Sequence, residues 1–323
     1  MRPLRNHGDV EGEKEARHPA RLPRVLVSVL GYNSPDKTVE TLRSLRRQSY
    51  PNYHLLLVDN ASDEGALERV AREFPELDIR RLPVNSGYAG GNNFALRLAR
   101  EENYDCLLIS NHDVEVEPRA VEYLVQTATS HPDAAAVGGV ELDPRTDVTR
   151  ASAGGAYSKW FSRLAWKSAR PGEDGNAWQE VFCVHGAFML LTAKAISRGV
   201  RMDEHLFMYF EEVDLGFQFR EKGLRALVDR RVIFRHNRDP QTPSPRTGYL
   251  MQRNRLYVVR KHGRWFHLLF YVLYSSLFEL PAKIIVRSLQ GRTSFALACF
   301  KGHLDGLRNS QELNSPSLTS PDR

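Results

Sequence analysis

The stretch RVLVSVLGYN (Arg24–Asn33) and the later LLLVDNASDE (55–64) decide the fold class. Each begins as a short run rich in valine or leucine, which is typical of a strand buried on both faces of a parallel sheet. Between them, Ser34 and Pro35 predict the start of a helix, because serine caps helices and proline suits a first turn. Strand, helix and strand in this order predict right-handed crossovers and an α/β fold with a mainly parallel sheet.

The same alternation continues along the first half of the chain. Ile79 to Leu82 predicts a weaker strand, a helix is expected around Asn93–Arg100, and DCLLISN (Asp105–Asn111) predicts a further buried strand. From about residue 145 to 235 aromatic and small residues replace this pattern, which indicates a second half built on the same sheet.

Composition and boundaries limit the class of protein. The 323 residues are 41% hydrophobic and 26% charged, which excludes a disordered or collagen-like chain. Three distant cysteines exclude a disulfide framework and indicate a reducing compartment. We expect a disordered polar tail without a secretory signal over 1–23, one large domain over 24–262, a helical segment over 263–308 and a disordered Ser/Pro-rich tail over 309–323.

Polar residues follow three of the predicted strands at the point where each apolar run stops. In open parallel sheets, ligands bind outside the carboxyl ends of the strands, so these residues are candidates for a binding site. They are Tyr32, Asn33, Asp59, Asn60, Asn111 and Asp113.

Two of these acids have alternative interpretations. Asp113 can hold a divalent cation whose other ligands are phosphate oxygens and water, or it can form an Asx turn before the next strand. Asp59 can accept a hydrogen bond from a pyrimidine base or a sugar hydroxyl, or it can cap the following helix.

The segment NSGYAGGNN (Asn85–Asn93) is rich in glycine. Gly87, Gly90 and Gly91 permit positive φ and close approach of the backbone to a ligand, and the helix that follows can face an anion. The dinucleotide fingerprint GxGxxG should follow the first strand, where GYNSPDK stands instead, so a nucleotide-dependent oxidoreductase is disfavoured. A tight turn made of small residues is the simpler alternative.

An acidic helix follows LFMYF and begins with Glu211 and Glu212. Acids in a first turn are stabilised by the helix dipole, by about 0.3–1 kcal/mol each, which explains one or two of them. The preceding apolar residues would also desolvate a carboxylate, raise its pKa and make it a better base.

Basic residues are concentrated between Arg230 and Arg264, where ten arginines and lysines accompany one acid, Asp239. Such a block indicates a nearby phosphate or anionic surface. Nucleic acid is excluded as the preferred partner, because no nucleic-acid-binding motif accompanies the block. The apolar run Trp265–Phe278 follows, and it is shorter than the roughly 20 residues of a spanning helix. It either lies on an anionic membrane surface or packs as a core helix.

Taken in order, the motifs resemble those of the family-2 glycosyltransferases, and most closely the bacterial rhamnosyltransferase-like branch. The matching strings span about residues 24–262 and are VSVLGYN, LLLVDNASDE, NSGYAGGNN, LLISNHDVEVEP, GAFMLL, MDEHLFMYFEEVDLGFQFREKG, the histidine of VIFRH, and YLMQRNRLYVVRKHG. The resemblance implies a GT-A (Rossmann-like) fold and an inverting enzyme that uses a nucleoside-diphosphate sugar.

The resemblance also implies roles for particular residues. The nucleotide-sugar site is expected to contain Tyr32, Asn33, Asp59, Asn60, Asn85, Gly87, Gly90, Gly91, Asn92 and Asn111. Asp113 matches the last acid of the family's DxD metal motif, whose first acid is Asn111 here, and His236 matches a histidine that completes metal coordination in some relatives. Glu212 matches the catalytic base, and Glu211 remains its rival because Glu-Glu replaces the usual Glu-Asp.

These roles imply a divalent cation, Mg²⁺ or Mn²⁺, as cofactor. The expected partners are a nucleoside-diphosphate sugar, with rhamnose as the sugar suggested by the branch, and a glycan or lipid-linked acceptor in cell-surface polysaccharide synthesis. We expect a cytoplasmic protein, peripheral on the inner face of the plasma membrane if Trp265–Phe278 binds lipid. The alternative is a non-catalytic module that binds sugar nucleotides or glycans.

Overall fold

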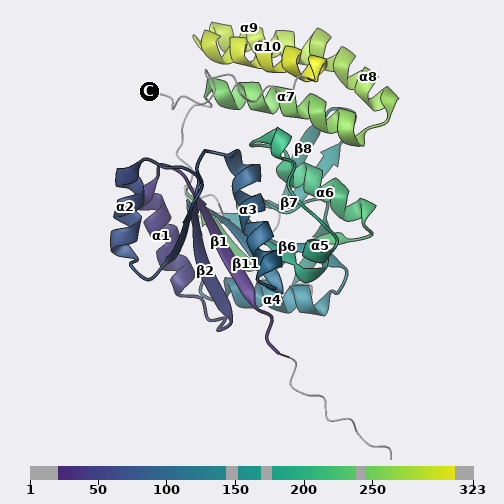
Figure 1. The fold of residues 1–323 in the computed structure, drawn as a ribbon. Coiled ribbons are helices and arrows are strands. Elements are labelled where there is room, and N and C mark those ends of the chain that lie inside the picture. The colour runs from purple at the N-terminus through teal and green to yellow at the C-terminus, as the bar shows by residue number, and fades with distance from the viewer. Residues whose placement is uncertain (1–20, 143–151, 169–176, 238–243, 310–323) are drawn as a thin grey trace, which may run out of the picture.

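A computed structural model describes residues 21–142, 152–168, 177–237 and 244–309 (Figure 1). The expected disordered tails therefore lie almost wholly outside the described residues, as does Arg238 of the basic block.

One mixed sheet forms the centre of the molecule. Its main path runs in the order β3-β2-β1-β4-β10-β6-β11-β5, while β7 and β8 extend from β6 and β9 pairs with β11. The strands are β1 (Val25–Gly31), β2 (Tyr53–Asp59), β3 (Asp78–Arg81), β4 (Cys106–Asn111), β5 (Val114–Val116), β6 (Ala134–Leu142), β7 (Ser152–Ser158), β8 (Arg163–Ser168), β9 (Trp178–Val181), β10 (Phe188–Thr192) and β11 (Arg225–His236).

The direction of the strands divides the sheet into two parts. From β3 to β4 all neighbours are parallel, as the alternation of strands and helices predicts. Strand β10 then enters antiparallel between β4 and β6, and β11 lies parallel to β6 and antiparallel to β5. The predicted α/β class with a mostly parallel central sheet is confirmed, with antiparallel strands added in the second half.

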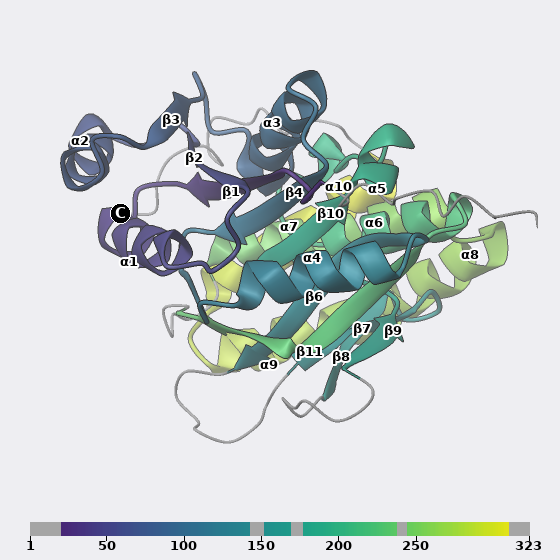
Figure 2. The ribbon, with the colours of Figure 1, turned by 90° about the horizontal axis from the view of Figure 1, so that it is seen from below.

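Helices cover both faces of this sheet (Figure 2). Apolar side chains of α1, α2 and α4 share one core with the sheet, and those of α3, α5 and α6 share the core on the opposite face. The helices are α1 (Pro35–Arg46), α2 (Glu64–Glu73), α3 (Gly87–Glu101), α4 (Ala120–Ser130), α5 (Ala193–Ser197) and α6 (Glu211–Glu221), with a 3₁₀ turn η1 (Glu204–Leu206) before α6. Each strand end that carries a candidate residue is thereby held between two packed layers.

Two helix starts differ from expectation. Helix α3 begins at Gly87, inside the glycine-rich segment, whereas a loop was expected there and a helix only from about Asn93. Helix α2 takes Asp63 as its N-cap, whereas Asp59 was the candidate cap; the carboxylate of Asp59 instead accepts the N–H of Ser62, before the helix begins.

A layer of C-terminal helices stands over the end of the sheet where β1 finishes (Figure 1). It contains α7 (Pro245–His262), α8 (Trp265–Tyr274), the π-helical turn η2 (Ser275–Glu279), α9 (Leu280–Leu289) and α10 (Thr293–Arg308). Helix α7 packs against α10, and its Leu256 and Val259 enclose Tyr271 of α8.

The apolar C-terminal helix is longer than the sequence predicts. Helical structure runs unbroken over Trp265–Leu289, 25 residues that include an 18-residue stretch with a mean hydropathy of 1.5, and does not stop at Phe278. Pro281 lies in the first turn of α9 directly after the π-helical turn, where the hydrogen-bond ladder is already shifted and a missing N–H costs little. Within the described chain this is one run whose length and composition would allow it to cross a bilayer, a test that core helices also pass.

Candidate active site

A cleft of about 1350 Å³ opens at the carboxyl ends of β1, β2 and β4. Its other walls come from the start of α3, the β7–β8 hairpin, the start of α6, and helices α7 and α8 with η2. The structure brings nine of the predicted residues to this one cavity: Tyr32, Asn60, Asn85, Gly87, Asn111, Asp113, Glu211, Glu212 and His236.

Asp113 and His236 meet on one wall of the cleft. The last residues of β11 pair antiparallel with β5, so His236 lies opposite Val114 and its Nε2 is 2.9 Å from Oδ1 of Asp113. Nδ2 of Asn111 lies 3.4 Å from the same ring nitrogen. Burial alone would raise the pKa of the Asp113 carboxyl, but the contact with His236 outweighs burial and holds that pKa below its usual value.

Behind this pair, Glu141 connects two histidines. Its Oε1 lies 3.5 Å from Nδ1 of His236, and its Oε2 lies 2.6 Å from Nε2 of His185. The ring of Trp166 stacks on His185 with centroids 3.9 Å apart, and both side chains line the cleft. When a histidine binds a metal through one ring nitrogen, a carboxylate that interacts with the other ring nitrogen fixes the orientation of the ring.

The residues of this wall fit a divalent cation bound jointly with a diphosphate. An ionised carboxylate, Asp113, and an imidazole, His236, present an oxygen and a nitrogen to the same place, and Mg²⁺ and Mn²⁺ accept such ligands. Among the described residues no group of three or more His, Cys, Asp or Glu is arranged to hold a metal ion. Phosphate oxygens and water would therefore have to supply most of the coordination.

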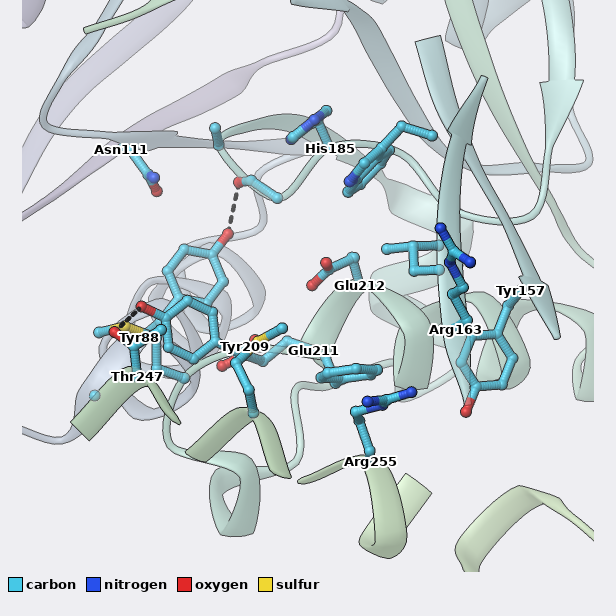
Figure 3. A pocket seen from close by; sticks show the side chains of 18 of the residues that line it. Tyr88, Asn111, Tyr157, Arg163, His185, Tyr209, Glu211, Glu212, Thr247 and Arg255 are labelled. Carbon is cyan, nitrogen blue, oxygen red and sulfur yellow. Dashed lines mark hydrogen bonds between the residues drawn. The ribbon is translucent and has the colours of Figure 1, made fainter. Parts of the chain in front are cut away.

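The start of α6 brings two acids to the other side of the cleft. Glu212 reaches into the cavity with Tyr88 and Asn111 across from it (Figure 3). Glu211 is only 2% exposed, and its Oε1 is buried without a hydrogen-bond partner in the described structure. Burial, and then the charge of Glu212, raises the pKa of Glu211 well above its usual value. The desolvation expected from LFMYF thus acts on Glu211, whereas Glu212 is the more accessible acid.

The backbone before these acids is strained. Phe207, Tyr209 and Phe210 have φ of 62°, 75° and 76°, in a region where side chains other than glycine cost about 1–3 kcal/mol each. Such strain persists only where the surroundings hold the backbone in place. We therefore expect hydrogen bonds from other parts of the protein to hold the carbonyl groups of this loop.

Helix α7 supplies these partners through two buried side chains. Nδ2 of Asn254, a residue that is 0% exposed, lies 2.9 Å from the carbonyl oxygens of Leu206, Met208 and Tyr209. The guanidinium of Arg253 donates to the carbonyl of Leu206 at 3.1 Å and to that of His205 at 2.8 Å. We call Arg253 and Asn254 the α7 clamp; it fixes the position of Glu211 and Glu212.

Other members of the basic block also bind within the protein. Arg231 pairs with buried Asp229, Lys261 pairs with Asp203 and Asp214, and Arg255 pairs with Glu279. The block was interpreted as a phosphate or anionic contact, and the structure instead shows these cations tying α7 and β11 to their neighbours. Sequence reports how many charges a segment has, but not which of them already have a partner.

At the carboxyl end of β2, Asn60 shapes the turn before α3. Its Nδ2 donates to Oδ1 of Asn85 at 3.0 Å and to the carbonyl of Gly87 at 3.1 Å, and its Oδ1 accepts from the N–H of Ser86. Gly87 has a φ of 69°, and a Cβ there would lie 2.3 Å from the carbonyl oxygen of Phe207. A glycine is therefore required where the start of α3 touches the loop before Glu211.

The acid of β2 lies slightly apart from the main cleft. Asp59 is 3% exposed, accepts the N–H of Ser62 at 3.2 Å, and lies in a small hollow beside Tyr32 and Asn33. Tyr32 lines both this hollow and the cleft, so the two are neighbours. Asp59 thus stabilises the loop before α2 through one carboxylate oxygen, but it does not cap that helix, whose N-cap is Asp63.

Three residues that were predicted to bind the nucleotide sugar lie in the interior of the protein, on α3. A Cβ on Gly90 would lie 2.5 Å from Cβ of Ser86, and one on Gly91 would lie 2.4 Å from the side chain of Leu30. Asn92 is 1% exposed and donates to the carbonyl of Tyr88. Gly91 thus lets α3 pack on β1, whereas Gly90 lies against Ser86 and Glu204, and Asn92 bonds within α3. None of the three lines the cavity, because the glycine-rich segment is helical.

Several lining residues were not predicted, and some could have been. Glu141 follows the apolar run of β6 near its carboxyl end, so the strand-end rule that selected Asp113 also applies to it. His185 precedes β10, and only the antiparallel direction of that strand brings it to the same edge. Tyr88, within the glycine-rich segment, donates from its hydroxyl to the carbonyl of Gly186 at 2.6 Å, and burial raises its pKa well above the usual value (Figure 3). No sequence signal distinguishes Arg163, which lines the cleft from β8.

Solved structures with the same fold are glycosyltransferases. A mannosyltransferase from Pyrobaculum calidifontis, solved with GDP-Man and Mn²⁺, superposes with a TM-score of 0.53 over 90% of this chain and 89% of its own, at 17% identity. S. aureus TarS (1–349) superposes with a TM-score of 0.54 over 88% of this chain and 80% of its own, at 15% identity. The chain therefore has the GT-A fold.

Sequence comparison identifies the family. Residues 27–199 match the model of glycosyl transferase family 2, and the chain belongs to this family. An N-acetylglucosaminyl-diphospho-decaprenol L-rhamnosyltransferase from Mycobacterium tuberculosis is 24% identical over 262 residues, which cover 72% of this chain and 83% of the relative. The predicted resemblance is thereby confirmed, and the protein is a glycosyltransferase.

Proposed function

We propose that the protein is an inverting glycosyltransferase that moves rhamnose from a nucleoside-diphosphate sugar to a glycan or lipid-linked acceptor. The observation that carries the proposal is that Glu212 and the pair Asp113–His236 line one cleft at the carboxyl end of the sheet. A displacement at a sugar carbon requires a proton acceptor and, in the same cavity, a wall that can hold a divalent cation against the departing diphosphate.

Glu212 is the group that we assign as the base. Its carboxylate takes the proton of the acceptor hydroxyl while that oxygen attacks the anomeric carbon, and the bond to the diphosphate breaks on the opposite face of the sugar. General-base help of this kind contributes about 10²–10⁴-fold to the rate. Direct displacement in one step inverts the anomeric configuration.

Glu211 supports this role without sharing it. Because its pKa is raised by burial, Glu211 remains protonated at pH values where an exposed acid is charged. A neutral Glu211 places no second negative charge beside Glu212, and the α7 clamp keeps both acids in position.

Asp113 and His236 would hold a Mg²⁺ or Mn²⁺ ion, with Asn111 beside them. A bound cation supplies Lewis-acid stabilisation of the negative charge on a departing diphosphate. Two solved structures of the same fold contain Mn²⁺, which supports a divalent cation here.

The substrate assignment follows from the mycobacterial relative. That protein is named as a rhamnosyltransferase acting on a diphospho-decaprenol-linked sugar, so we assign rhamnose as the donor sugar and a lipid-linked glycan as the acceptor. An acceptor of this kind in cell-surface polysaccharide synthesis supports our proposal that the protein acts in the cytoplasm, at the inner face of the plasma membrane.

A panel of nucleotide sugars with detection of released nucleoside diphosphate tests the proposal. We expect release from dTDP-rhamnose that requires Mn²⁺ or Mg²⁺ and stops with EDTA. Binding of the nucleotide without release from any donor and acceptor would instead indicate a non-catalytic sugar-nucleotide module.

A further inference from the structure

The helical run Trp265–Leu289 leaves an apolar face without a partner in the described structure. Trp265, Leu269, Leu273 and Leu277 follow one another at intervals of four residues, so they share one side of the helix. Their exposed fractions are 74%, 51%, 51% and 64%. Beyond the π-helical turn the exposure continues to Leu289, which is 83% exposed. Contiguous apolar surface of this kind marks an interaction site.

The opposite side of the run is fixed lengthwise to the domain. Tyr271 and Ser275 are 0% exposed and Leu280 is 5% exposed. Nζ of Lys283 donates to Oε1 of Gln252 on α7 at 2.9 Å, and Glu279 pairs with Arg255 of α7. A helix held along its length in this way lies parallel to whatever covers its outer face, and it cannot cross a bilayer without losing these contacts.

The charges around the apolar face favour an anionic partner. Residues 263–309 contain six cations against two acids, Glu279 and Asp305. Lys283 is turned to Gln252 and Glu279 on the packed side, and the other five are Arg264, Arg287, Arg292, Lys301 and Arg308. Glu279 pairs with Arg255, and Asp305 accepts from the hydroxyl of Tyr249 at 2.9 Å. Aromatic and aliphatic residues flanked by cations match an anionic lipid surface, where both kinds of group contribute to binding.

An aromatic path joins this face to the cleft. Phe161 and Tyr274 line the cavity, with ring centroids 5.1 Å apart. Tyr274 stacks in turn on Phe270, at 6.2 Å, and on Phe278, at 6.5 Å. Phe270 is 37% exposed and Phe278 is 66% exposed. The cavity that contains Glu212 thus reaches the apolar face through a continuous row of rings.

We propose that the outer face of Trp265–Leu289 lies in the plane of an anionic lipid bilayer, so that the cleft opens toward the membrane surface. With α10 beside α9, this face forms one membrane-binding side of the protein. In the reaction proposed above, on which this part of the inference rests, the apolar chain of a lipid-linked acceptor stays in the bilayer while its sugar enters the cleft past Phe161 and Tyr274, which line it.

Vesicle flotation of the full chain tests the inference. Vesicles of phosphatidylcholine with phosphatidylglycerol should carry the protein, and vesicles of phosphatidylcholine alone should carry much less. The double variant Leu273→Glu, Leu277→Glu should bind at least about tenfold more weakly, because two leucines leave the bilayer. The control Leu22→Glu changes a leucine that is also 51% exposed but lies far from the cleft, and it should bind like the wild type.

Each outcome decides the inference. Absence of flotation on anionic vesicles, or equal flotation of the double variant and the wild type, overturns it. A dimer in light scattering that the double variant abolishes, without vesicle binding, shows that a second copy covers this face. Resistance to extraction by alkaline carbonate shows a spanning helix, which also overturns it.

The same samples separate this inference from the proposed function. Thermal shift with nucleoside diphosphates and Mn²⁺ should be equal in the wild type, the double variant and the control, because the changed residues lie outside the cleft. Normal flotation without any nucleotide-dependent shift would contradict the proposed function alone.

Discussion

Replacing Asn254 by alanine removes the amide that holds the loop before Glu211. Nδ2 of Asn254 lies 2.9 Å from the carbonyl oxygens of Leu206, Met208 and Tyr209. The amide has two N–H groups, and a buried carbonyl left without a partner costs about 1–3 kcal/mol, so we expect a loss of about 2–6 kcal/mol in the free energy of unfolding. Without the amide, the positive φ angles of this loop are no longer held.

The consequence for activity should exceed the consequence for nucleotide binding. A displacement of about 1 Å can cost 10²-fold in rate, so release of nucleoside diphosphate by Asn254→Ala should fall at least about tenfold. Asn254→Asp keeps the shape of the side chain and serves if the alanine variant does not fold. Asn52→Ala is the matched control, because Asn52 makes one exposed bond to the carbonyl of Leu22. Wild-type turnover and thermal stability in both Asn254 variants would refute the reasoning.

Three further changes test other parts of the site. Burial raises the pKa of Glu211, so the native state holds this proton to a higher pH than the unfolded chain does. The stability that the bound proton contributes is therefore lost progressively as the pH rises above about 4.3, and the melting temperature falls. Glu211→Gln should make the melting temperature depend less on pH in this range. Gly87→Ala should lower the free energy of unfolding by about 1–3 kcal/mol through its positive φ and the contact with Phe207, while Gly65→Ala, in open space on α2, should raise it by about 0.5–1 kcal/mol; equal melting temperatures would contradict this. Asp113→Asn should abolish the extra thermal shift that Mn²⁺ adds to a nucleoside diphosphate, and an undiminished shift would count against the metal assignment.

The parallel half of the fold follows from local pattern. Apolar runs that end in polar residues locate β1, β2 and β4, and the strand-end rule then places Asn60, Asn111 and Asp113 together at the cleft. Such rules succeed because every neighbour from β3 to β4 is parallel and each crossover contains a helix.

The position of His236 beside Asp113 needed information of another kind. It depends on antiparallel pairing of the end of β11 with β5, a strand of three residues that no periodicity reveals. The family resemblance supplied it instead, together with the roles of Glu211 and Glu212.

The contacts that charged side chains make within the protein were the feature least predictable from the sequence. The cations of α7 looked available for phosphate, yet Arg253, Arg255 and Lys261 bind carbonyls and acids of the same chain. The extent of the C-terminal helix was also underestimated, because Glu279, Pro281 and Lys283 interrupt the apolar run without ending the helix.

Turnover of the nucleotide sugar by Glu212→Gln tests most directly whether Glu212 is the catalytic base. This change keeps the shape of the side chain and removes its basicity, while Asp113 and His236 are unchanged across the cleft. The account predicts a rate at least about 10²-fold below wild type with nucleoside diphosphate still bound, and Glu211→Gln should lose much less. Wild-type turnover by Glu212→Gln would contradict the assignment of Glu212 as the base.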